Sequence, residues 1–87
     1  MSKPAKQNHA VNHIRKLLAE RSLTIPSRNL TLPDNQSWVV FEQAGKQLGV
    51  DTASGVWIRQ SSEDNWQCLC LPINVSGAIQ AIEFLTS

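Results

Sequence analysis

Glycine is scarce in this chain, which contains four glycines among 87 residues. The sequence has no glycine-rich loop that could cradle a phosphate, no Gly-x-Ser-x-Gly motif and no pair of carboxylates at helical spacing. Glu63 and Asp64 are adjacent in a polar loop, where neighbouring side chains point apart. The sequence therefore predicts a protein that is not an enzyme and that uses no cofactor.

Long hydrophobic runs are also missing. No apolar run follows Lys3 and Lys6, and no apolar window reaches the length of a membrane span, so we expect no secretion signal, no membrane partner and a cytoplasmic location. Charged residues make up 17% of the chain, below the usual quarter, which leaves much of the surface neutral. A domain of this size buries a modest core, and we expect a homodimer to add stability.

The chain has two cysteines, Cys68 and Cys70. On one strand their Cα atoms would lie about 7 Å apart, outside the usual range for a disulfide, so we expect reduced, buried thiols. His9 and His13 lie four residues apart on a predicted helix, and the four side chains together suggest zinc as a weaker alternative. The favoured interpretation has surface histidines, core cysteines and no metal.

The net charge of +1 hides an uneven distribution. Residues 29–87 carry two basic and six acidic residues, whereas residues 1–28 carry a single acid, Glu20, and six basic residues. Those six are Lys3, Lys6, Arg15, Lys16, Arg21 and Arg28. A basic helix and tail of this kind can contact successive phosphates, although a solvated surface helix has a similar composition. The leading hypothesis is therefore a regulatory or accessory protein that binds nucleic acid through its N-terminal third.

The spacing of apolar residues predicts three helices. Residues 1–7 have no periodicity and are expected to form a flexible basic tail before a single domain over residues 8–87. Asn8 is expected to cap a first helix, Asp34 a second helix over residues 37–48 that ends at Gly49, and Asn74 or Ser76 a third that runs to Phe84. The second helix is expected to bury a stripe formed by Trp38, Phe41, Ala44 and Leu48. Residues 29–32 show a weak alternation typical of an edge strand.

Residues 56–60 and 66–71 predict a β-hairpin with a polar loop at residues 61–65. Period-2 alternation places one set of apolar residues on one face, namely Val56, Ile58, Trp66, Cys68 and Cys70, and another set on the opposite face, namely Trp57, Leu69 and Leu71. Helices should cover one face, and a second subunit or a partner the other. The expected fold is a single α+β domain with the order α-α-β-β-α.

Trp57 and Arg59 share the second face of this hairpin. Tryptophan and arginine are the residue types most enriched at binding hot spots. These two residues therefore predict a partner-binding surface and give the alternative function, a protein-binding adaptor or inhibitor, or a structural homodimer.

Three segments form a further pattern: Leu30-Thr31-Leu32-Pro33-Asp34, Leu48-Gly49-Val50-Asp51 and the segment from Ser54 to Arg59. Together they cover about a third of the chain and resemble the strand, helix, turn and second helix of the ribbon-helix-helix repressors. The resemblance implies a dimer in which Asn29 and Thr31 read the major groove and residues 54–60 are helical. The β-branched and aromatic Val56-Trp57-Ile58 and the need of residues 66–71 for a strand partner favour the hairpin instead.

Overall fold

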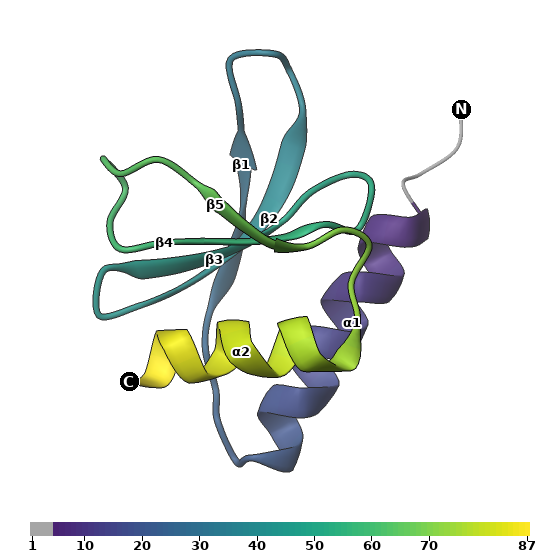
Figure 1. Cartoon of the computed structure of the whole chain (residues 1–87), viewed down its shortest axis with the longest axis vertical. Helices are drawn as coiled ribbons and strands as arrows, with labels where there is room; N and C mark the ends of the chain where they lie inside the picture. The colour runs from purple at the N-terminus through teal and green to yellow at the C-terminus, as the bar shows by residue number, and fades with distance from the viewer. Residues whose placement is uncertain (1–4) are drawn as a thin grey trace.

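The computed structural model describes residues 5–87 as an α+β domain with a helix at each end and five strands between them (Figure 1). The elements are α1 (Ala5–Glu20), β1 (Ser27–Thr31), β2 (Ser37–Gln43), β3 (Lys46–Val50), β4 (Val56–Arg59), β5 (Gln67–Cys70) and α2 (Val75–Thr86). Each strand pairs antiparallel with the next, so the order in the sheet is the order in the chain. The predicted α+β class is confirmed.

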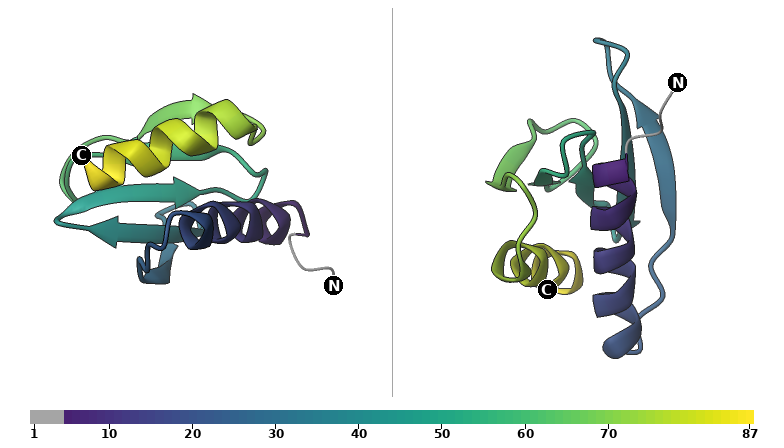
Figure 2. Two further views of the ribbon diagram at one scale, coloured as in Figure 1. Left: turned by 90° about the horizontal axis from the view of Figure 1, so that it is seen from below. Right: turned by 90° about the vertical axis from the view of Figure 1, so that its right-hand side faces the viewer.

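Both helices lie on the same side of the twisted sheet (Figure 2). Their apolar faces and the facing strand residues form one core, made of Ala10, Val11, Ile14, Leu18, Ile25, Phe41, Leu48, Val50, Val56, Ala78, Ala81, Ile82 and Leu85. Each helix packs one face on this core, which explains why its apolar residues recur every three or four positions. No helix within residues 5–87 has the length and apolar character needed to span a membrane.

The first helix begins earlier than the sequence predicts. Helix α1 starts at Ala5, not after Asn8, and Gln7 is 5% exposed. The Gln7 amide donates to the backbone carbonyls of Ser37, at 2.8 Å, and Val50, at 3.1 Å. Residues 5–7 of the expected tail are therefore part of helix α1, and its other residues, 1–4 with Lys3, lie outside the described residues.

The predicted helix over residues 37–48 is wrong, because this segment forms the β2–β3 hairpin. Its turn residues Ala44 and Gly45 have φ values of 54° and 84°, the left-handed pair that joins two strands tightly. In β2, Val39 and Phe41 face the helices while Trp38 and Val40 face the opposite side. The order is thus α-β-β-β-β-β-α, which also removes the helix pair that the ribbon-helix-helix resemblance requires.

The hairpin of residues 56–60 and 66–71 is confirmed as β4 and β5, and residues 29–31 belong to the edge strand β1. The predicted faces are only partly correct. Val56 pairs with Cys70, but a bulge then pairs Trp57 with Cys68. Cys68 consequently joins the face of Trp57 and is exposed, contrary to prediction, whereas Leu69 and Cys70 pack toward the helices.

The third predicted helix is confirmed as α2. Asn74 is its N-cap and accepts a hydrogen bond from the backbone N–H of Gly77 at 2.7 Å. The helix extends past Phe84 to Thr86 and buries Ala78, Ile82 and Leu85 against the sheet. The order of loops brings the start of α1, the β3–β4 loop and the β5–α2 connection to one end of the domain (Figure 1).

Candidate functional site

The face of the sheet opposite the helices, which we call the open sheet face, carries the three tryptophans and a row of charged and polar side chains. Directly paired residues of neighbouring antiparallel strands share a face. By this register the open sheet face holds Arg28, Leu30, Trp38, Val40, Glu42, Gln47, Gly49, Trp57, Arg59 and Cys68, and Trp66 joins them through its contact with Trp38.

Three tryptophans cluster on this face. The ring centroids of Trp38 and Trp57 are 5.3 Å apart, as are those of Trp38 and Trp66, and the planes are tilted by 36° and 51°. Gly49 lies beneath the rings, because a Cβ atom there would come within 2.9 Å of Trp38 Cε3 and 3.1 Å of Trp66 Cη2. Gly49 therefore lets the rings lie against the backbone, in tilted contacts typical of favourable aromatic pairs.

The three indole N–H groups differ in their partners. Trp38 Nε1 donates to Gln36 Oε1 at 3.3 Å, and Trp57 Nε1 donates to Asp51 Oδ2 at 2.7 Å. The other oxygen of Asp51 accepts from the backbone N–H groups of Ala53 and Gly55, so the β3–β4 loop fixes the orientation of Trp57. Trp66 Nε1 is buried without a hydrogen-bond partner among the described residues.

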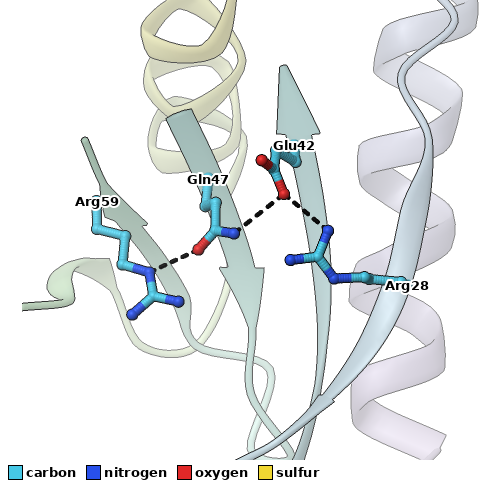
Figure 3. A network of polar contacts seen from close by, with 4 residues as sticks. All are labelled: Arg28, Glu42, Gln47 and Arg59. Atoms are coloured by element: carbon cyan, nitrogen blue, oxygen red, sulfur yellow. Dashed lines mark hydrogen bonds and ion pairs between the residues drawn. The ribbon is translucent and has the colours of Figure 1, made fainter. Parts of the chain in front are cut away.

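A row of four polar side chains crosses β1 to β4 (Figure 3). Arg28 Nη1 donates to Glu42 Oε1 at 2.7 Å, and Gln47 Nε2 donates to the same oxygen at 3.1 Å. Gln47 is fully buried, and its Oε1 accepts from Arg59 Nε at 2.6 Å. The guanidinium of Arg59 also lies 4.1 Å above the ring of Trp66, a cation–π contact that joins the polar row to the tryptophan cluster.

The row carries a net positive charge, since two arginines flank one carboxylate. Hydrogen bonds from Arg28 and then from Gln47 hold the pKa of Glu42 below its ordinary value. Burial lowers the pKa of Arg59, and the positive charge of Arg28 lowers it further. The two guanidinium groups therefore act on each other, and an added negative charge near them would be stabilised.

Among the five predicted basic residues that lie within residues 5–87, Arg28 is separated from the other four. Lys6, Arg15 and Lys16 are exposed on α1, and Arg21 is exposed directly after it. The Arg15 guanidinium donates to Ser27 Oγ at 3.1 Å. Arg28 lies on the open sheet face, on the other side of the sheet from α1, and is paired with Glu42.

The alternative zinc site is not formed. Within residues 5–87, no three side chains of His, Cys, Asp or Glu are placed where they could hold one metal ion. His9 and His13 line hollows along α1, whereas Cys68 lies on the open sheet face.

Sequence reasoning found Trp57 and Arg59 but missed the residues that hold them. Gln47, Glu42 and Gly49 were assigned to a helix and its end, which hid their place beside Arg59 and the tryptophans. The four-residue run Trp38-Val39-Val40-Phe41, rich in β-branched and aromatic residues, is the signal that indicates a strand here.

Comparison of the chain with models of known families, with curated proteins and with solved structures finds no match. The proposals below consequently rest on the geometry and chemistry of this chain alone.

Proposed function

We propose that this protein is a non-enzymatic binding protein that holds a partner protein on its open sheet face. The observation that supports the proposal is the tryptophan cluster with Arg59 stacked on Trp66, on a sheet face that neither helix covers. Tryptophan and arginine dominate the energetics of protein interfaces because they combine large contact area with directed hydrogen bonds.

The layout of the face fits such an interface. Leu71 is 59% exposed and lies near Trp57, since a Cβ atom on Gly55 would meet both side chains. Trp57 is fixed by Asp51, and Arg59 is fixed by Gln47 and Trp66, so little side-chain freedom is left to lose on binding. Protein interfaces usually have an apolar centre and a polar rim, and the tryptophans and arginines of this face have that arrangement.

The chemistry of the face also defines the partner. Arg28 and Arg59 flank a single carboxylate, Glu42, and donate only some of their N–H groups within the row. A protein that offers an apolar side chain to Trp57 and Leu71 and a carboxylate to the two arginines complements this surface.

Two exposed apolar residues give a matched test. Leu71 borders the open sheet face and is 59% exposed, whereas Val75, in the first turn of α2, is 56% exposed. The Leu71→Ser and Arg59→Ala variants should each lose a partner that the wild type and Val75→Ser retain from the organism's own extract. Quantitative mass spectrometry measures this difference, and purified partner should then bind Arg59→Ala at least tenfold more weakly. Equal retention by all four proteins would contradict the proposal.

A second copy of the chain is the other occupant to be tested. Sedimentation velocity over a range of concentrations distinguishes the two cases. A wild-type dimer that Leu71→Ser and Arg59→Ala convert to a monomer, while Val75→Ser does not, would replace the partner protein with a structural homodimer.

Exposed Lys6, Lys16 and Arg21 support nucleic-acid binding along α1 as a second candidate function. Binding of this kind should weaken steeply with salt and should fall for all sequences in a Lys16→Ala/Arg21→Ala variant. Fluorescence anisotropy with mixed DNA and RNA oligonucleotides measures both effects. No binding at low salt would exclude this candidate.

A further inference from the structure

We infer that strand β1 accepts an extended, acidic segment of the partner protein, which adds one strand to the sheet. β1 is one of the two edge strands, so it pairs with β2 on one side and with no described residue on the other. Extended segments bind free sheet edges because their main-chain groups continue the hydrogen-bonded ladder. Arg28 belongs both to β1 and to the open sheet face, so this strand addition rests on the proposed function and specifies how the partner lies there.

The register of β1 and β2 determines which backbone groups of β1 are free. The N–H of Leu32 donates to the Gln36 carbonyl at 2.9 Å, and the N–H of Glu42 donates to the Pro26 carbonyl at 3.3 Å. Because hydrogen-bonded residues alternate along an antiparallel strand, the even-numbered residues from 26 to 32 face β2. The backbone N–H and C=O groups that point outward are therefore those of Ser27, Asn29 and Thr31.

The opposite edge of the sheet, β5, is less suited to an added strand. Its pairing with β4 contains the bulge at Trp57, which disrupts the regular spacing of its outward groups. Pro72, two residues after the end of β5, has no N–H to donate. β1 has no bulge, proline or lysine, the features with which proteins protect an edge. β1 is therefore the edge that is open to pairing.

Positive charge lies beside β1 on both faces of the sheet. On the open sheet face, Arg28 donates to Glu42 through Nη1, and its Nε and Nη2 groups donate to no described residue (Figure 3). On the helix side, the Arg15 guanidinium donates to Ser27 Oγ at 3.1 Å. Residues 21–33 contain no acidic residue. These charges favour an added strand that carries acidic side chains.

The same charges argue against a second copy of the chain as the added strand. If two β1 strands paired antiparallel about Asn29, each Arg28 would lie opposite Leu30 of the other copy. Arg15 and Arg28 of both copies would then lie along one seam, and the seam would gain no carboxylate to offset their repulsion. A segment of a different protein avoids this repulsion because it supplies the acid.

The register also predicts the order of side chains in the added strand. Arg28 and Leu30 both point to the open sheet face and bond to β2 through their backbone. With an added antiparallel strand they would form non-hydrogen-bonded pairs, in which side chains lie closest. An acid then fits opposite Arg28 and an apolar residue opposite Leu30. Because the strands are antiparallel, the apolar residue comes two positions before the acid.

The probe is the capped peptide acetyl-Ser-Thr-Val-Thr-Glu-Thr-Ser-amide. One control peptide has lysine in place of glutamate, and a second is N-methylated at the central threonine, whose N–H should donate to the Asn29 carbonyl. In an NMR titration the probe should give saturable shifts centred on the amides of Ser27, Asn29 and Thr31. Both controls should bind about tenfold more weakly or worse. No saturable shifts in the millimolar range, or equal binding of the N-methylated peptide, would overturn the strand addition.

Asn29→Pro blocks the edge and leaves the pairing with β2 intact, because the N–H of Asn29 points outward. This variant should keep the circular dichroism spectrum of the wild type and bind the probe about tenfold more weakly. Asn29→Thr is the matched control, since it also loses the amide side chain but keeps the N–H, and it should bind as the wild type does. Wild-type affinity in Asn29→Pro would reject the strand addition, and the N-methylated peptide tests the same hydrogen bond without any variant.

The extract experiment separates this strand addition from the proposed function. Loss of the same partner by Leu71→Ser and by Asn29→Pro would support both. If Leu71→Ser loses the partner and Asn29→Pro retains it, the open sheet face binds the partner and the strand addition is wrong. A wild-type dimer that Asn29→Pro converts to a monomer in sedimentation velocity would show that a second copy occupies β1, which would also overturn the acidic segment.

Discussion

The two faces of the sheet bury their side chains in different ways. On the helix side, Phe41, Leu48 and Val56 are covered by α1 and α2. On the open sheet face, Val40 and Gln47 are equally buried, with 0% exposure, although no helix lies over them. There the rings of Trp38 and Trp66 lie over Gly49, and the Arg59 guanidinium lies over the ring of Trp66. Because Asp51 holds Trp57 and Gln47 holds Arg59, the open sheet face is already ordered before a partner binds, although no helix covers it.

Phe41→Ala should have the largest effect and tests the helix side. Phe41 is 1% exposed within the core, and its truncation should lower the free energy of unfolding by about 3–5 kcal/mol. This approaches the whole stability expected of a small domain. Urea denaturation followed by circular dichroism measures the loss. A change below about 1 kcal/mol would mean that the helices do not close this face as described.

Gly49→Ala tests the open sheet face. The added methyl group would come within 2.9 Å of Trp38 and 3.1 Å of Trp66, so we expect a loss of about 1–3 kcal/mol and an altered near-ultraviolet circular dichroism spectrum. Gly45→Ala is the control. No atom lies within 4 Å of its new Cβ, and its φ of 84° costs about 1–2 kcal/mol without moving the tryptophans. Identical spectra for the two variants would contradict the ring packing over Gly49.

Gln47→Leu should have a smaller effect, about 1–2 kcal/mol, because it removes the acceptor of Arg59 Nε and one donor to Glu42 while keeping a similar volume. The Nε–H signal of Arg59 in an NMR spectrum should shift and broaden. If this signal stays unchanged, the cation–π contact with Trp66 holds Arg59 by itself.

The smallest effect concerns the titration of Glu42. Its pKa is lowered in the folded state by Arg28 and Gln47, so Glu42 contributes stability above its unfolded-state pKa and loses that contribution as the pH falls through the folded-state pKa. The melting temperature of the wild type should exceed that of Glu42→Gln near neutral pH, and the difference should shrink once the pH falls below the ordinary glutamate pKa of 4.5 and vanish below the lowered pKa of the folded state. A difference that persists at the acidic end would assign the effect to packing instead of charge.

The sequence predicts well the two terminal helices and the β4–β5 hairpin. Helices α1 and α2 each present a single stripe to the core, and the β4–β5 hairpin has a polar loop between two strand-like runs. In the two helices, the spacing of the apolar residues fits only a helical period. Of the two caps predicted for the last helix, Asn74 or Ser76, the structure has Asn74, whose side chain acts within one turn.

The β2–β3 hairpin was missed because its apolar residues also fall at helix spacing and no polar loop separates its two strands. Trp38 and Val40 occupy the open sheet face and Phe41 the helix side, so apolar residues occur at both strand and helix spacings. Gly49 was interpreted as a helix end, although its role is to make room for two tryptophan rings. Recognising a two-residue turn at Ala44-Gly45 would have predicted the hairpin instead of a helix.

The candidate site was predictable only in part. Trp57 and Arg59 stand out by residue type, but the link from Arg59 through Gln47 and Glu42 to Arg28 depends on the register of four strands. A register that includes a bulge at Trp57 cannot be derived from alternation alone, because the bulge moves Leu69 and Cys68 to unexpected faces.

The sequential order of the five strands has a consequence for how the domain folds. Every strand pairing closes a short loop, the longest being residues 60–66, so little chain entropy is lost before each pairing forms. Low separation between paired residues is associated with fast folding. Only the docking of α1 and α2 joins the two ends of the chain, and we therefore expect the sheet to assemble hairpin by hairpin, with closure by the terminal helices as the step that commits the chain to its native state.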